Sequence, residues 1–110
     1  RLHIFSFPMV GATPEQRISS TQLTNPTTFS ADYVVTPMDL FGAMPRWIRI
    51  ADDGVNRICS FSHDGYEFIQ FHSIGRLDFL LGGANQVGWF ANAVNATNSA
   101  RARLLAWIEA

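Results

Sequence analysis

The chain contains one cysteine, no lysine and three glutamates among its 110 residues. A single cysteine excludes an intrachain disulfide and argues against a zinc site built on cysteines. Because Cys59 sits in an apolar run, we expect a small buried residue and not a reactive thiol. The eight positive charges are all arginines, and the formal net charge is −1. The chain lacks the basic excess that binding to phosphates needs, so we expect no nucleic-acid partner.

Long apolar runs and a high density of charge are also missing. No stretch reaches the roughly 18 apolar residues that a helix needs to cross a bilayer, so we expect no membrane span. Charged residues make up 15% of the chain and hydrophobic residues 47%, a composition too apolar for intrinsic disorder. Aromatic residues, at 13%, supply large side chains for a core. We therefore predict a single domain over residues 1–110.

Strand signals dominate what is present. Helix signals are limited to two single turns, at residues 13–17 and 39–44. Runs rich in β-branched and aromatic residues predict seven strands, over residues 3–10, 27–35, 46–51, 56–62, 66–73, 86–94 and 100–108. Asp-Gly pairs at Gly54 and Gly65 are typical of hairpins, because glycine accepts the positive φ of a tight turn. The pattern predicts an all-β fold, an antiparallel β-sandwich.

Alternation within the strands predicts which side chains face the core. Arg57, Cys59 and Phe61 share one face of the strand at residues 56–62. In the next strand, the same rule places Phe71 and His72 on opposite faces. We therefore expect two layers, each with one face buried and one face in water.

Four stretches carry a resemblance to a known family: residues 47–57, 62–68, 78–80 and 86–89. Together they resemble the second half of a concanavalin A-like lectin/glucanase domain of the laminin-G-like kind, over roughly residues 46–109. The resemblance implies a jelly-roll sandwich. Full members of that family are usually longer than this chain, so it also implies that early strands are shortened or missing. Because such domains occur in glycan-binding modules and in phage virion or tail proteins, it implies an extracellular or virion location.

Residues for catalysis are scarce. The glucan-cleaving members of that family use carboxylates that alternate along one strand, whereas Glu15, Glu67 and Glu109 form no such alternation with an aspartate. The histidine spacing matches no standard zinc pattern. His63 and Asp64 suggest a base and its orienting acid, but adjacent residues of a strand point to opposite faces. We predict that the chain is not an enzyme, with no catalytic residue, metal or cofactor.

Two alternatives remain open for the acidic stretch at residues 52–56. Its carboxylate and amide oxygens suit calcium. The same residues are typical of a hairpin turn in which Asp and Asn side chains cap backbone groups, and the full EF-hand spacing is absent. We expect the turn.

Aromatic rings and arginines are the candidates for binding. Trp47, Tyr66 and Trp89 could stack on the apolar faces of sugar rings, and Arg76 could make a forked contact with an acidic sugar. The alternative for the rings is packing in the core. The alternative for Arg76 is pairing with an aspartate of a neighbouring strand.

These observations predict a non-catalytic structural or adhesion module that associates with itself or with other subunits of an assembly. Low charge together with many aromatic residues and arginines suits an interface core. The resemblance adds a phage virion or another extracellular assembly as the setting. A carbohydrate-binding, lectin-like module, with a glycan as its partner, is the alternative.

Overall fold

The computed structural model describes residues 1–10, 15–37, 45–91 and 103–108, and these residues form seven strands and no helix. The strands are β1 (Leu2–Ser6), β2 (Met9–Val10), β3 (Glu15–Asn25), β4 (Thr28–Pro37), β5 (Trp47–Asp52), β6 (Asn56–Ser62) and β7 (Ile69–Gly75). Every pairing between them is antiparallel. The prediction of an all-β, antiparallel chain is therefore confirmed.

The first sheet is built around β3. Strands β1 and β2 follow each other along one edge of β3, and β4 pairs with its other edge. The β3–β4 hairpin is tight because Asn25 Oδ1 accepts hydrogen bonds from the amide and the hydroxyl of Thr27, at 3.0 and 3.1 Å. The sheet is thus three strands wide, with the longest strand in its centre.

Two predictions for this part of the chain are wrong. The predicted helical turn at residues 13–17 is replaced, over residues 15–17, by the start of β3, while residues 13 and 14 lie outside the described residues. The predicted first strand, residues 3–10, is divided into β1 and β2 at Phe7 and Pro8. Proline has no backbone N–H for the ladder, which explains the interruption. The helical turn predicted at residues 39–44 also lies outside the described residues.

The second sheet is the meander β5–β6–β7. Strand β6 has the predicted bounds, and β5 starts one residue later and ends one residue later than predicted. Strand β7 starts at Ile69 and not at residue 66, because Asp64 holds the preceding residues in a loop. Its Oδ1 accepts hydrogen bonds from the amides of Tyr66 and Glu67, at 2.8 and 3.0 Å.

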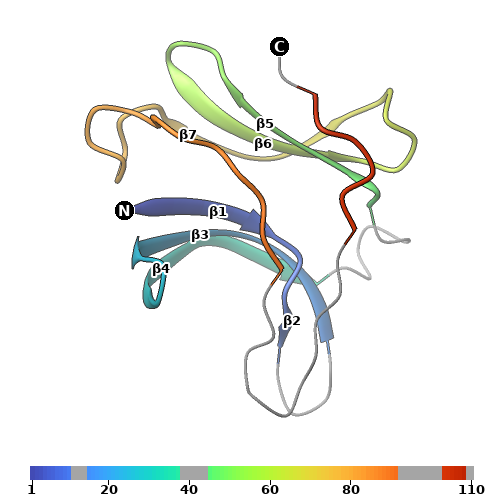
Figure 1. Ribbon diagram of the computed structural model, residues 1–110, viewed down its shortest axis with the longest axis horizontal. Helices are drawn as coiled ribbons and strands as arrows, with labels where there is room; N and C mark the ends of the chain where they lie inside the picture. Colours follow the sequence, from blue (N-terminus) through green and yellow to red (C-terminus); the bar gives the residue numbers. More distant parts are fainter. Residues whose placement is uncertain (11–14, 38–44, 92–102, 109–110) are drawn as a thin grey trace.

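Figure 1 shows the sheet of β1, β3 and β4 on one side of the molecule and the sheet of β5, β6 and β7 on the other. The buried apolar residues between them are Phe5, Ile18, Cys59 and Phe61, and the rings of Phe5 and Phe71 stack at 5.7 Å. Cys59 is fully buried, as predicted.

A bulge in β7 changes the predicted alternation. Ser60 pairs with Gln70 and Cys59 with His72, so Phe71 is the extra residue. Phe71 stacks on Phe5 while His72 bonds to a residue of β3, and both side chains therefore face the first sheet. The prediction that they lie on opposite faces is wrong.

The last two predicted strands are not found where the structure describes them. Residues 86–91 and 103–108 have no regular secondary structure. The remaining residues of the predicted strands at 86–94 and 100–108 lie outside the described residues.

Candidate functional site: a polar cluster between the sheets

Polar side chains from five strands and one loop meet between the two sheets. They are His3 of β1, Ser20 of β3, Tyr33 of β4, Arg57 of β6, His72 of β7 and Asp78 of the segment after β7. Side chains of this kind are expensive to bury unless they bond to one another. Among the described residues, every buried side-chain nitrogen and oxygen has a hydrogen-bond partner.

Arg57 is the centre of the cluster and is only 3% exposed. Its Nε donates to His3 Nδ1 at 3.2 Å. One terminal nitrogen donates to the carbonyl oxygen of Asp78 at 2.8 Å, and the other donates to the carbonyl oxygen of Arg76. The groups that accept hydrogen bonds from this buried guanidinium are uncharged and do not neutralise it. Its positive charge therefore acts on the neighbouring side chains.

The direction of the hydrogen bonds through the histidines follows from Arg57, because a guanidinium N–H can only donate. His3 Nδ1 must accept, so the hydrogen of neutral His3 lies on Nε2, which is 2.7 Å from Ser20 Oγ. Ser20 Oγ then accepts from His3 and donates to His72 Nδ1 at 3.0 Å. The bonds form one directed chain from Arg57 through His3 and Ser20 to His72.

The two histidines of the hydrogen-bonded cluster, His3 and His72, are held neutral. Burial, the positive charge of Arg57 and the proximity of His72 together lower the pKa of His3 from 6.5 to about 4, with burial the largest cause and Asp78 opposing them. Burial and the charge of Arg57 also lower the pKa of His72.

Tyr33 closes the cluster on the side of β4. Its hydroxyl donates to the Asp78 carboxylate at 2.5 Å, and its ring lies 5.1 Å from the ring of His72 and 5.3 Å from that of His3. Burial and the bond to Asp78 raise the pKa of Tyr33. Tyr33 therefore ties the segment after β7 to the first sheet.

The segment after β7 is itself conformationally unusual. Phe79 has a φ of 57°, which side chains other than glycine rarely adopt. Arg1 donates to the Phe79 carbonyl oxygen at 3.1 Å and lies over its ring, 5.2 Å from the ring centre. Together, Arg1 and Arg57 bind the carbonyl oxygens of residues 76, 78 and 79, which ties this segment to the N-terminal residue and to β6.

The cluster contains residue types that serve in catalysis, and two of its members, Ser20 and Arg57, are buried. Ser20 is hydrogen-bonded to two histidines, as a nucleophile would be to its base, yet it has no exposed surface. Burial raises the pKa of the Cys59 thiol to about 11, so it stays protonated at neutral pH. The hydrogen bonds of the cluster link the two sheets, and its histidines are groups that can take up protons.

The four residues predicted to bind carbohydrate do not share one site. Trp47 pairs with Ser62 at one end of β6, and Arg76 follows Gly75, which pairs with Asn56 at the other end. Six residues of strand separate these ends by about 20 Å. Tyr66, 89% exposed, lies in the loop beside Trp47, and Trp89, 50% exposed, lies in a stretch without regular structure. Carbohydrate binding by these residues stays a prediction.

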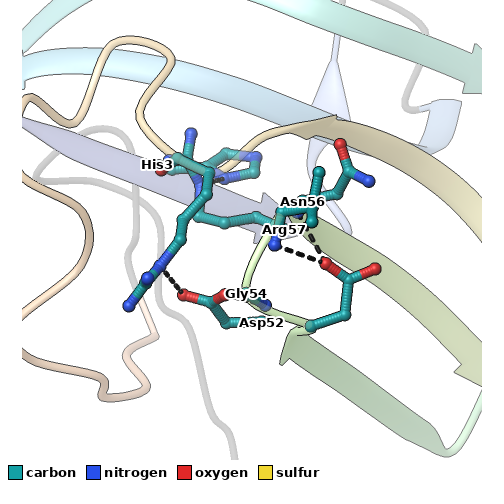
Figure 2. A network of polar contacts seen from close by, with 8 residues as sticks. His3, Asp52, Gly54, Asn56 and Arg57 are labelled. Carbon is teal, nitrogen blue, oxygen red and sulfur yellow. Dashed lines mark hydrogen bonds and ion pairs between the residues drawn. The ribbon is translucent and has the colours of Figure 1, made fainter.

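Arg76 forms an ion pair with Asp52, and pairing with an aspartate was the predicted alternative to carbohydrate binding for this residue. Its Nε lies 2.8 Å from Asp52 Oδ2, and this contact spans the hairpin end of the second sheet (Figure 2). The side chain borders an open depression of about 540 Å³ together with Gly54, Val55 and Asp78.

The acidic stretch at residues 52–56 is the predicted hairpin turn. Asp52 Oδ1 accepts from the Gly54 amide at 2.8 Å (Figure 2). Asp53 Oδ1 accepts from the amides of Val55 and Asn56, at 2.8 and 2.6 Å, and these bonds lower the pKa of Asp53. The carboxylates therefore cap backbone groups, and the described residues contain no cluster of three or more His, Cys, Asp or Glu that could hold a metal ion.

His63 and Asp64 both lie in the β6–β7 loop. The Asp64 carboxylate caps amides of its own loop and accepts from the Ser62 hydroxyl at 2.9 Å, which lowers its pKa. The ring of His63 packs edge-on against Phe61 at 5.9 Å. Asp64 is thus engaged in the loop.

Sequence reasoning missed the polar cluster entirely. Its members are scattered from residue 3 to residue 78 and match no local motif. The one available signal was Arg57, because a charged residue on the face shared with Cys59 and Phe61 needs polar partners from the opposite sheet.

Comparison with known proteins found no protein-family model, no curated protein and no solved structure that matches this chain. None of the described residues belongs to a helix long and apolar enough to cross a membrane.

Proposed function

We propose that the chain is a non-catalytic structural or adhesion module that works by binding copies of itself or other subunits of an assembly. Its two sheets would form the antiparallel, jelly-roll-like sandwich of the concanavalin A-like type, and its setting would be a virion or another extracellular assembly. The observation that carries the proposal is an apolar surface on an open strand of the second sheet.

That surface lies on β5. Ile48 pairs with Phe61 and Ile50 with Cys59, so both isoleucines belong to the face that carries the core. Phe61 and Cys59 are fully buried, whereas Ile48 is 48% exposed and Ile50 is 46% exposed. Within the described residues, β5 pairs with β6 alone, so its other edge is open. An open strand beside half-exposed isoleucines favours association with a further surface.

The chemistry-bearing residues support the same proposal. The histidines, the serine and the arginine of the polar cluster are occupied by bonds to one another between the sheets. Arg76 is engaged by Asp52, and Asp53 and Asp64 cap backbone amides. An arrangement of this kind favours a scaffold that presents a surface over one that transforms a substrate.

Sedimentation velocity tests the proposal. The full chain is expected to sediment as a species larger than a monomer at concentrations of tens of micromolar, and Ile50→Asp is expected to return it to the monomer because a charge would be buried in the interface. Val55→Asp is the matched control: Val55 is 71% exposed at the turn next to β5, and its replacement should leave association intact. A wild-type chain that stays monomeric at every concentration would contradict binding between copies of the chain.

A further inference from the structure

We propose that Arg57, His3, Ser20 and His72 form an acid-sensitive latch between the two sheets. At neutral pH the latch is closed by the directed chain of hydrogen bonds. In weak acid, protonation of His3 breaks its bond to Arg57, protonation of His72 reverses its bond to Ser20, and the β1–β3–β4 sheet separates from the β5–β6–β7 sheet. The inference stands on contacts inside the chain and does not depend on the proposed function.

The latch joins the layers at separate points. Arg57 of β6 bonds to His3 of β1, and Ser20 of β3 bonds to His72 of β7. Figure 2 shows His3 and Arg57 lying together next to the β5–β6 turn. Among the described residues, the apolar core between the layers consists of Phe5 and Ile18 from one sheet and Cys59 and Phe61 from the other, with Phe7 and Phe71 packed against it. The polar bonds add links between the layers beside this core.

Protonation is incompatible with the closed chain because it turns an acceptor into a donor. A second hydrogen on His3 would lie on Nδ1 and face the Nε–H of Arg57, 3.2 Å away. A second hydrogen on His72 would lie on Nδ1, and the hydroxyl of Ser20 would have to rotate and accept from both histidines. Protonation of His3 thus breaks the link to Arg57 and adds a positive charge beside a buried guanidinium, whereas protonation of His72 reverses the direction of the second link.

The groups that surround His3 set the balance of charge. Arg57 of β6 and His72 of β7 disfavour its protonation, and Asp78 after β7 favours it. Tyr33 of β4 contacts its ring edge-on, and the thiol of Cys59 on β6 lies 4.0 Å from Nε2. Both of these groups are uncharged at neutral pH, because the pKa of each is raised. The nearest fixed charge is therefore the positive charge of Arg57.

The pH window follows from the depressed pKa values. A histidine whose pKa is lower in the folded state contributes stability that is fully present above its unfolded value of 6.5. That stability is lost as the pH falls through the folded value, which for His3 is about 4. The latch should therefore weaken between pH 6.5 and pH 4. The unfolding equilibrium constant should rise by at most about 10-fold per pH unit for each histidine.

Histidine NMR of the full chain tests the closed latch without any substitution. With ¹⁵N-labelled protein at pH 7.5, His3 and His72 are expected as neutral rings with the hydrogen on Nε2, and His3 should titrate near pH 4. A His3 ring with its hydrogen on Nδ1, or a midpoint at the ordinary value of 6.5, would overturn the proposal. The NOE between Phe5 and Phe71 reports opening: it should disappear as the histidines titrate, and its persistence after both are protonated would also overturn the proposal.

Urea unfolding at pH values from 7.5 to 4 tests the energetic side. His3→Gln keeps an acceptor for Arg57 and a donor for Ser20 but cannot take up a proton, so the loss of stability in weak acid should become shallower. His63→Gln removes a histidine outside the cluster and is the matched control, which should retain the wild-type slope. An equally steep loss in His3→Gln and in the wild type would refute the latch.

Discussion

At the scale of single residues, two glycines in the turns of the second sheet share a positive φ but differ in the space around them. Gly54 has a φ of 91° and Gly65 a φ of 84°, a range that residues with a Cβ rarely adopt. A Cβ on Gly54 would have nothing within 4 Å, whereas one on Gly65 would lie 2.9 Å from the indole of Trp47. The pair separates the effect of backbone strain from the effect of a collision.

Gly65→Ala is expected to destabilise the chain by about 2–4 kcal/mol, because alanine adds backbone strain and forces Trp47 to move. Gly54→Ala carries the strain alone and should cost about 1 kcal/mol. Urea unfolding monitored by circular dichroism measures both. Equal losses of unfolding free energy in the two variants would show that the indole of Trp47 moves aside without a cost in stability.

At the scale of elements, the strands differ in how much of their apolar surface the opposite sheet covers. Ile18 on the central strand β3 is fully buried, whereas Ile50 on the open strand β5 is 46% exposed. Ile18→Ala should therefore cost about 2–5 kcal/mol, since it leaves a cavity between the sheets. Ile50→Ala, the same change of side chain, should cost about 1 kcal/mol or less. Thermal unfolding at low protein concentration compares them, and a similar loss in both would contradict the layered core.

The same comparison explains which elements the sequence could predict. Strand β6 was predicted to the residue because its apolar alternation is regular and an Asp-Gly turn lies on either side. Strand β3 was missed because its buried positions hold serines as well as Ile18, so its apolar period is weak. The bulge at Phe71 has no signature in composition, and it is what turns His72 toward Ser20. The cluster therefore depends on register and sheet packing, which local patterns do not encode.

At the scale of the whole molecule, two sets of groups respond to acid, and they do so in different ranges of pH. The histidines lie between the sheets and lose their contribution as the pH falls below 6.5, with the contribution of His3 lost by about pH 4. Asp53 and Asp64 lie at the two turns of the second sheet, and their amide bonds lower the pKa of each below 3.8. A group of this second kind stabilises the fold above 3.8 and loses its contribution as the pH falls through its folded value. Acid should therefore loosen the contact between the sheets before it weakens the turns.

Asp53→Asn tests the lower range. Asparagine keeps an oxygen for the amides of Val55 and Asn56 but removes the charge that strengthens both bonds, so the variant should be less stable than the wild type at pH 6. Because the wild-type carboxylate becomes protonated in strong acid, the difference between the two urea midpoints should narrow as the pH falls below 3.8. The difference should be constant between pH 6 and pH 4.5, where the histidines titrate in both proteins alike. A gap that closes in that upper range would assign the turn, and not the cluster between the sheets, to the first stage of acid unfolding.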